Sequence, residues 1–303
     1  AIALSMELIV LAGMASAQNA TDRLGDALPP GATQRLGTLR MKYPDGIADL
    51  AYLPDGRGLI AVGRDLQIWD LGEGRLLETI QVAEHGMDKM QFGRKQIHLS
   101  ADGGRLLLRD GPELVEYDLV GRRELHRFAV DQTGWSWAMY SPDETRVLTT
   151  GLAPPTLKEF ELATGRELIT IKGDFDVFHA AAYGPDGATA FVAGGFDYNV
   201  AHYDLRTGQK LHEFLKDYRA YNLLLSPDGE RLLVGSRSMA TEWKIEGYEE
   251  LQRFTGHHGG TVKTLVYCHE PEQILTGSRD GSIRRWNREA AEVLVRWVPH
   301  QSL

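Results

Sequence analysis

A sequence pattern that returns six times, at intervals close to 43 residues, constrains the fold of this chain more than any other feature. Each copy holds a turn related to Ser-Pro-Asp-Gly, then an apolar run, then an aromatic residue that is followed in most copies by an acidic one. The turns begin at residues 53, 100, 141, 184, 226 and 268, and the aromatic residues are Trp69, Tyr117, Phe160, Tyr203, Trp243 and Trp286. A period of this length is typical of folds in which every copy is one supersecondary unit.

Each copy is predicted to form four short antiparallel strands. The first strand leads into the Pro-Asp-Gly turn, which supplies a fixed φ, a side-chain cap and a residue of positive φ. The third strand ends at the aromatic residue, and a second turn leads into the fourth strand. One such sheet is too small to be stable by itself, so neighbouring copies must stack and bury residues between them. The 33 glycines and 12 prolines agree with short strands and argue against a helical bundle.

The turns and aromatic positions together resemble the WD-repeat β-propeller family over nearly the whole of residues 35–303. The sixth copy has the fullest pattern, with Gly256-His257, a Thr-Gly-Ser-Arg-Asp-Gly run from 276 and Trp286-Asn287. The resemblance implies a structural chain of hydrogen bonds inside one blade, and its members would be His257, Thr276 or Ser278, Asp280 and Trp286. Closing such a stack into a ring would protect the sheet faces at its ends.

The strand count predicts how the ring is built. Residues 36–43 read as an additional strand of the fourth type, and in the family such a strand completes a blade whose other three strands come from the end of the chain. We therefore predict an all-β propeller with six complete four-stranded blades, in a seven-bladed ring that is truncated at the C-terminus. The alternative is a closed six-bladed ring with residues 36–43 packed elsewhere.

The N-terminal residues indicate export. Residues 1–17 read as a signal peptide without its basic start, ending in the small residues Ala15-Ser16-Ala17 that a signal peptidase accepts. The alternative is an apolar helix that is buried or anchored in a membrane. Residues 18–34 are predicted to be an irregular leader. The segment 25–40 resembles exported WD-repeat proteins of planctomycete type, which implies a bacterial protein of the periplasm or cell envelope.

Composition narrows the classes of function. The net charge of −9 disfavours nucleic acid and anionic lipid as main partners. A single cysteine, Cys268, excludes an intramolecular disulfide and a zinc site made mainly of thiolates. His257 and His258 are adjacent and would point to opposite sides of a strand, so we predict no metal and no cofactor there. The motifs of common hydrolases, zinc proteases and nucleotide-binding enzymes are absent.

Aromatic pairs at the start of three consecutive copies provide candidate binding residues. From these pairs we select Trp137, Tyr218, Arg219 and Tyr221 as candidates for contact with a protein or peptide partner, because aromatic and arginine side chains anchor many interfaces. The alternative is that these side chains fill the core between blades, which is the role predicted for Trp135 and Phe178.

Two classes of function remain, and the fold by itself does not separate them. The first is a non-catalytic interaction scaffold, and the second is a propeller hydrolase, similar to a lactonase, with a metal at the central funnel. A hydrolase needs polar ligands at equivalent positions of several blades, and these positions hold Asp49, Trp137, Ala180, Asn222 and Thr264. One carboxylate among five residues favours binding over catalysis.

Overall fold

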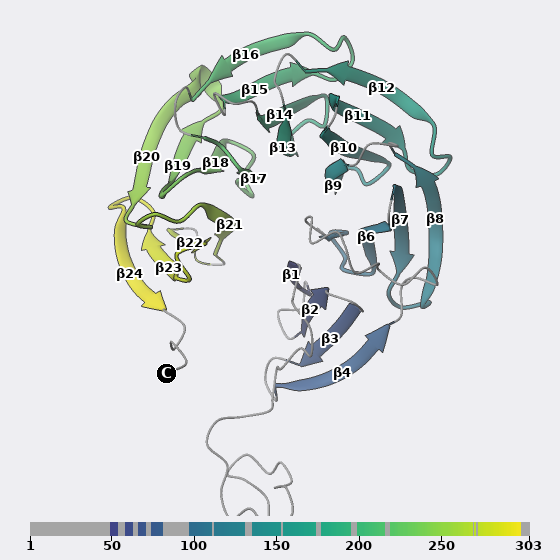
Figure 1. Cartoon of the computed structure of the whole chain (residues 1–303), viewed down its shortest axis with the longest axis horizontal. Coiled ribbons are helices and arrows are strands. Elements are labelled where there is room, and N and C mark those ends of the chain that lie inside the picture. The colour runs from purple at the N-terminus through teal and green to yellow at the C-terminus, as the bar shows by residue number, and fades with distance from the viewer. Residues whose placement is uncertain are drawn as a thin grey trace, which may run out of the picture.

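The computed structural model describes residues 49–297, apart from 54–57, 63–65, 71–73, 81–96, 111, 131–134, 153, 174–176, 195–198, 216–218, 269 and 271. This part of the chain forms six antiparallel sheets of four strands each and one 3-10 helix, η1 (Glu246–Tyr248). The sheets follow one another around a common axis in an open arc (Figure 1). The prediction of six four-stranded blades is confirmed. The predicted signal peptide, the leader and the strand at 36–43 lie outside the described residues.

The sheets are numbered here in chain order. Sheet 1 consists of β1 (Asp49–Tyr52), β2 (Gly58–Val62), β3 (Leu66–Asp70) and β4 (Arg75–Ile80). Sheet 2 consists of β5 (His98–Leu99), β6 (Arg105–Asp110), β7 (Glu113–Asp118) and β8 (Arg123–Ala129). Sheet 3 consists of β9 (Trp135–Tyr140), β10 (Arg146–Leu152), β11 (Pro155–Glu161) and β12 (Glu167–Lys172).

The second half of the arc repeats this plan. Sheet 4 consists of β13 (Phe178–Tyr183), β14 (Thr189–Gly194), β15 (Asn199–Asp204) and β16 (Lys210–Phe214). Sheet 5 consists of β17 (Asn222–Leu225), β18 (Arg231–Gly235), β19 (Met239–Lys244) and β20 (Glu249–Thr255). Sheet 6 consists of β21 (Val262–Tyr267), β22 (Gln273–Ser278), β23 (Ile283–Asn287) and β24 (Glu292–Trp297).

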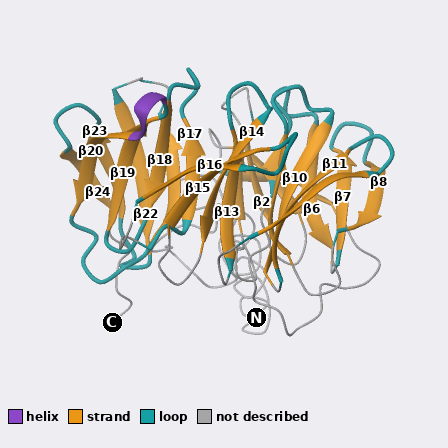
Figure 2. Ribbon diagram, turned by 90° about the horizontal axis from the view of Figure 1, so that it is seen from above, coloured by secondary structure: helices purple, strands orange, loops and turns teal. Residues whose placement is uncertain are grey.

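Two faces of the molecule follow from the strand order. Neighbouring strands of each sheet are hydrogen-bonded in chain order, with the first strand nearest to the axis and the fourth at the outer edge (Figure 1). The turns between first and second strands and between third and fourth strands lie on one face, which also carries η1 (Figure 2). We call it the turn face. The opposite face, where the described connections 236–238, 256–261 and 279–282 lie, is called the loop face.

The six repeated aromatic residues occupy equivalent places, because each is the penultimate residue of the third strand of its sheet. Beside each of them the register of the fourth strand shifts, and the additional residue is a leucine in all six sheets: Leu77, Leu125, Leu168, Leu211, Leu251 and Leu294. A bulge increases the local twist of an edge strand and discourages pairing with another chain. The outer edges of the arc are therefore protected against edge-to-edge association.

Hydrophobic clusters join each sheet to the next. The cluster between sheets 1 and 2 includes Ile60 and Val115, and the cluster between sheets 5 and 6 includes Phe254 and Trp286. Three further clusters join sheets 2 and 3, sheets 3 and 4, and sheets 4 and 5. In the described part of the chain no such cluster joins sheet 6 to sheet 1, and these sheets lie at the two ends of the arc (Figure 1). Packing between sequence neighbours therefore stabilises the arc.

Candidate interaction surface

Three of the four predicted binding residues are described, one on the innermost strand of sheet 3 and two on the connection that leads into sheet 5. Trp137 is on β9 and packs against the clusters on both sides of sheet 4, and its buried indole Nε1 has no hydrogen-bond partner among the described residues. Tyr221 is partly buried, and the exposed Arg219 on the same connection has a φ of 53°. Tyr218 lies outside the described residues. Sheet 4 therefore separates Trp137 from the other two described candidates.

A row of side chains across sheets 4, 5 and 6 surrounds Tyr221. The imidazole of His179 on β13 lies 5.3 Å from the Tyr221 ring, and Lys263 Nζ on β21 lies 4.4 Å from the centroid of the same ring. His179 and Lys263 are each the additional residue of a bulge in the innermost strand of their sheet. The sequence analysis missed both residues. The sequence does contain a signal for this row. Its three members directly precede the equivalent strand positions Ala180, Asn222 and Thr264.

Those compared positions do lie on the innermost strands, as the repeat predicts. Ala180 is fully buried, Thr264 is exposed, and Asn222 Nδ2 donates a hydrogen bond of 2.7 Å to the carbonyl oxygen of Lys263.

In the described part of the chain no three His, Cys, Asp or Glu side chains are grouped to hold a metal ion. Within the same residues, no helix has the length and apolar character that crossing a membrane requires.

A chain of hydrogen bonds runs through sheet 6. Trp286 Nε1 donates to Thr276 Oγ1 at 2.8 Å, and Thr276 Oγ1 lies 2.7 Å from His257 Nε2. His257 Nδ1 lies 3.2 Å from Asp280 Oδ2. Because the Asp280 carboxylate can only accept, Nδ1 of the neutral imidazole carries the ring proton, and Nε2 therefore accepts a hydrogen bond from the Thr276 hydroxyl. The structure thus brings His257, Thr276, Asp280 and Trp286 together.

Serine residues stabilise the turn beside this chain. Ser278 Oγ accepts a hydrogen bond of 3.2 Å from the backbone N–H of Asp280, so it caps the turn while Thr276 supplies the hydroxyl of the chain. Ser282 Oγ donates to Asp280 Oδ1 at 2.7 Å. Burial acts to raise the pKa of Asp280, but hydrogen bonds from Ser282 and His257 outweigh it and hold this pKa at about 2. Burial lowers the pKa of His257. At neutral pH the pair is a carboxylate and a neutral imidazole.

The difference between the two hydroxyl groups can be tested by substitution. We expect Thr276→Val to lower the free energy of unfolding by about 1–3 kcal/mol, because it leaves the buried donor of Trp286 without an acceptor. Ser278→Ala is the matched control and should cost less, since the N–H that it caps is partly exposed. Urea unfolding of both variants measures the difference. A larger loss of stability for Ser278→Ala than for Thr276→Val would show that Ser278, and not Thr276, supplies the hydroxyl of the chain.

Comparison with known families supports this description of sheet 6. Residues 248–287 match the family model described as WD domain, G-beta repeat. These residues run from the last residue of η1 through β20 to the end of β23. Residues 248–287 form a WD40 repeat. The repeat contains all four members of the hydrogen-bonded chain, and it supports the WD-repeat family as the origin of the six-copy pattern.

Two curated proteins show similarity to short parts of the chain. U3 snoRNP-associated protein-like EMB2271 of Arabidopsis thaliana is 33% identical over 81 residues, which are 26% of this chain and 17% of that protein. Guanine nucleotide-binding protein negative regulator 1 of Schizosaccharomyces pombe is 37% identical over 70 residues, which are 22% of this chain and 18% of that protein. The similarity thus spans less than a fifth of each relative. Both relatives are eukaryotic, so they do not support the planctomycete resemblance of the leader.

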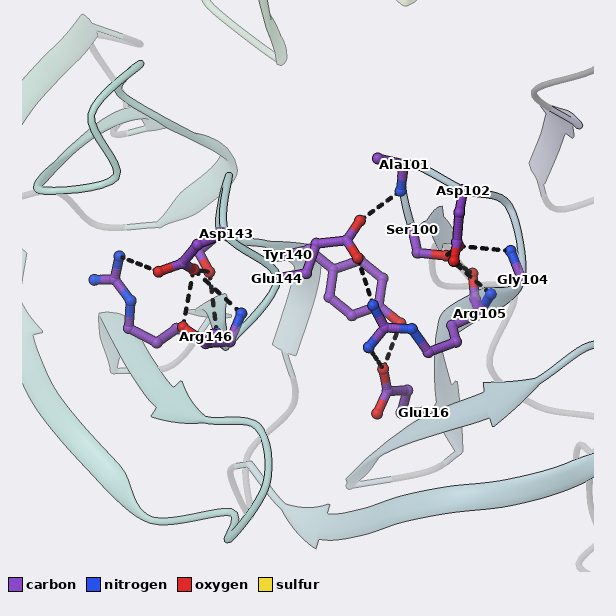
Figure 3. A network of polar contacts seen from close by, with 12 residues as sticks. Ser100, Ala101, Asp102, Gly104, Arg105, Glu116, Tyr140, Asp143, Glu144 and Arg146 are labelled. Carbon is purple, nitrogen blue, oxygen red and sulfur yellow. Dashed lines mark hydrogen bonds and ion pairs between the residues drawn. The ribbon is translucent and has the colours of Figure 1, made fainter.

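Outside the WD40 repeat, a polar triad that the sequence analysis missed joins sheet 2 to sheet 3. Tyr140 at the end of β9 donates its hydroxyl proton to Glu116 Oε1 on β7 at 3.0 Å (Figure 3). Arg105 Nη1 on β6 lies 3.0 Å from the same carboxylate oxygen, and this guanidinium also pairs with Glu144 from the next turn. Glu116 is 1% exposed. The buried charge is therefore satisfied from both of the sheets that meet there.

The same triad recurs at two further contacts between sheets. Glu159 Oε1 lies 2.8 Å from Arg146 Nη1 and accepts a hydrogen bond of 3.0 Å from Tyr183 in sheet 4. The equivalent set between sheets 5 and 6 is Arg231, Glu242 and Tyr267. Arg231 Nη1 lies 3.5 Å from Glu242 Oε2, and the Tyr267 hydroxyl donates to Glu242 Oε1 at 3.2 Å. Burial raises the pKa of Glu159 and of Glu242, and the neighbouring arginines oppose this shift. Each triad ties one sheet to the next.

A sequence signal for the triad exists. The arginine stands five residues after the serine of the turn, the glutamate directly precedes the repeated aromatic residue, and the tyrosine directly precedes the next turn. Where one member is missing, the others are missing too. Sheet 4 has Thr189 and His202 at the first two positions, and the residue before the next turn is Leu225. The three positions therefore vary together across each contact between sheets.

Between sheets 4 and 5, His202 occupies the position of the glutamate. Its Nδ1 lies 2.8 Å from the hydroxyl oxygen of Tyr248 in η1, and its ring stacks on Phe191 with a centroid distance of 4.1 Å. Burial lowers the pKa of His202. The uncharged ring fits this contact, because Thr189 has replaced the arginine that would balance a glutamate.

A partly buried histidine, His98 on β5, has a buried Nδ1 with no hydrogen-bond partner among the described residues, and it leads us to expect that stability depends on pH. Burial lowers its pKa from 6.5 to about 4 in the folded protein. Below pH 6.5 the unfolded chain binds a proton that the folded chain does not, so the free energy of unfolding falls as the pH decreases from about 6.5 to about 4. One proton corresponds to a slope of up to about 1.4 kcal/mol per pH unit.

We expect the stability of the His98→Leu variant to fall less steeply between about pH 6.5 and about pH 4, because the unfolded variant has no imidazole at position 98 to bind the additional proton. Urea unfolding of parent and variant at several pH values between 7.5 and 4.5 measures the two slopes. Equal slopes would show that His98 is protonated in the folded protein as readily as in the unfolded chain.

Proposed function

We propose that this chain is a non-catalytic interaction module that binds a protein or peptide near the axis of its loop face. The observation that carries the proposal is the row formed by His179, Tyr221 and Lys263, with Trp137 one sheet further along the arc. Aromatic side chains beside cations are typical of the centres of protein interfaces. WD40 repeats, of which residues 248–287 are one, indicate a protein-interaction scaffold.

We also propose that the protein is exported and acts in the periplasm or cell envelope. Support comes from residues 1–14, which are apolar except for Ser5 and Glu7, and from the small residues that precede Gln18. Mass spectrometry of protein recovered from the envelope fraction of its source cells should find an N-terminus near Gln18. Recovery of the intact segment from that fraction would contradict removal of the signal.

Capture experiments with matched variants test the interaction. The parent protein, immobilised, should retain a partner from the envelope fraction, and the double variant Trp137→Ala, Tyr221→Ala should lose that same protein. The control pair Val120→Ala, Glu246→Ala changes two highly exposed side chains of the turn face and should retain it. Circular dichroism must show that all three proteins are folded, since Trp137 packs on core residues. Equal retention by both double variants would contradict the proposed surface.

A further inference from the structure

Basic side chains gather on the loop face where sheets 5 and 6 meet. The backbones of Arg237 and Thr261 form an antiparallel bridge between the two sheets, and the N–H of Arg279 donates to the carbonyl oxygen of Thr261 at 3.0 Å. Lys263 follows two residues later, with its ammonium group over the ring of Tyr221. Arg237 and Arg279 are exposed. Backbone contacts thus bring three cationic residues close together, and we call them the basic patch (Arg237, Lys263 and Arg279).

Among the described residues, no carboxylate pairs with the two exposed arginines of this patch. Asp280 is next to Arg279 in sequence, but its carboxylate accepts hydrogen bonds from His257 and Ser282 and forms no ion pair with Arg279. No described carboxylate lies within 4 Å of Arg237 or Arg279.

We propose that the basic patch binds a short acidic segment of a partner protein. This inference rests on the proposed function and names the chemistry of the partner. A run of glutamates or aspartates can pair with the two exposed arginines while its chain crosses Tyr221 and Lys263. The rest of the protein brings the net charge to −9, so a polyanion that continues beyond the patch is repelled. A short acidic peptide therefore fits the charge distribution better than a nucleic acid does.

Fluorescence anisotropy with a defined probe tests the proposal. The probe is a fluorescein-labelled peptide of eight glutamates, titrated with the full chain. We expect the charge-reversal variant Arg237→Glu, Arg279→Glu to bind at least ten-fold more weakly than the parent. The control Arg166→Glu, Arg206→Glu makes the same change of charge at exposed turn-face positions and should bind like the parent. Binding should also weaken as salt is raised, because exposed charges are screened.

Three results would overturn the inference: no binding to the parent, equal loss in both double variants, or equally tight binding of a single-stranded oligonucleotide of the same charge. Circular dichroism of each variant shows whether the loss comes from unfolding, and the single variants Arg237→Gln and Arg279→Gln then provide milder changes. If the envelope partner is captured through Trp137 and Tyr221 while the glutamate peptide fails to bind, the proposed function stands and the acidic specificity is wrong.

Discussion

Replacing Arg146 with methionine is expected to lower the free energy of unfolding by about 3 kcal/mol. The substitution leaves Glu159 at 4% exposure without its cationic partner, and removing one member of a buried ion pair costs about 3–5 kcal/mol. The lower end of this range applies because the side chain of Arg146 is 26% exposed. Urea unfolding at pH 7 measures the loss.

The double variant Arg146→Met, Glu159→Met is expected to be more stable than the single variant, because it removes the buried carboxylate together with its partner. Lys158→Met is the control. It breaks a pair with Glu167, whose side chain is 44% exposed, and such surface pairs contribute about 0–1 kcal/mol. If the double variant is less stable than Arg146→Met, the triad contributes through the carboxylate itself and the argument from a stranded charge fails.

The second large effect is expected at Trp286. We expect Trp286→Ala to cost about 3–5 kcal/mol, the usual loss for truncating a buried tryptophan. The side chain is 1% exposed, contacts Phe254 of sheet 5 at a centroid distance of 5.7 Å and donates to Thr276. The substitution therefore removes packing between two sheets and one member of the hydrogen-bonded chain.

Trp286→Phe separates these two contributions. Phenylalanine retains most of the contact with Phe254 and loses the indole N–H, so its cost should be about 1–2 kcal/mol. Thermal and urea unfolding of both variants give the comparison. Equal costs for phenylalanine and alanine would show that the hydrogen bond, and not the packing between sheets, is the main contribution of Trp286.

The sequence was sufficient to predict the sheets, because turn residues and strand alternation act within one copy. The repeated aromatic residues lie where the pattern placed them, and Trp286 and Asp280 lie in the chain that the resemblance implied. The choice between Thr276 and Ser278 needed coordinates, since both hydroxyls stand on one strand two residues apart. The resemblance left this choice open.

Contacts between copies were harder to predict than those within a copy. Tyr140 and Glu116 are 24 residues apart, and their pairing depends on how two sheets stack. The row around Tyr221 depends on bulges at His179 and Lys263, which shift a side chain out of strand alternation. Such shifts of register leave no mark in the hydrophobic pattern of a single sequence. A comparison of equivalent positions in neighbouring copies would have found the triad.

The six blades form an open arc, in which sheets 1 and 6 are not neighbours (Figure 1). The bulge leucines Leu77, Leu251 and Leu294 are equivalent and are 48%, 39% and 46% exposed, so cysteines at these positions can carry spin labels in a Cys268→Ser background. Pulsed electron paramagnetic resonance then gives the distance between positions 251 and 294, on neighbouring sheets, and between 77 and 294, on the two ends. In the open arc we expect a clearly longer distance for the second pair. Equal distances would show that sheets 1 and 6 pack as ring neighbours and would contradict the open arc.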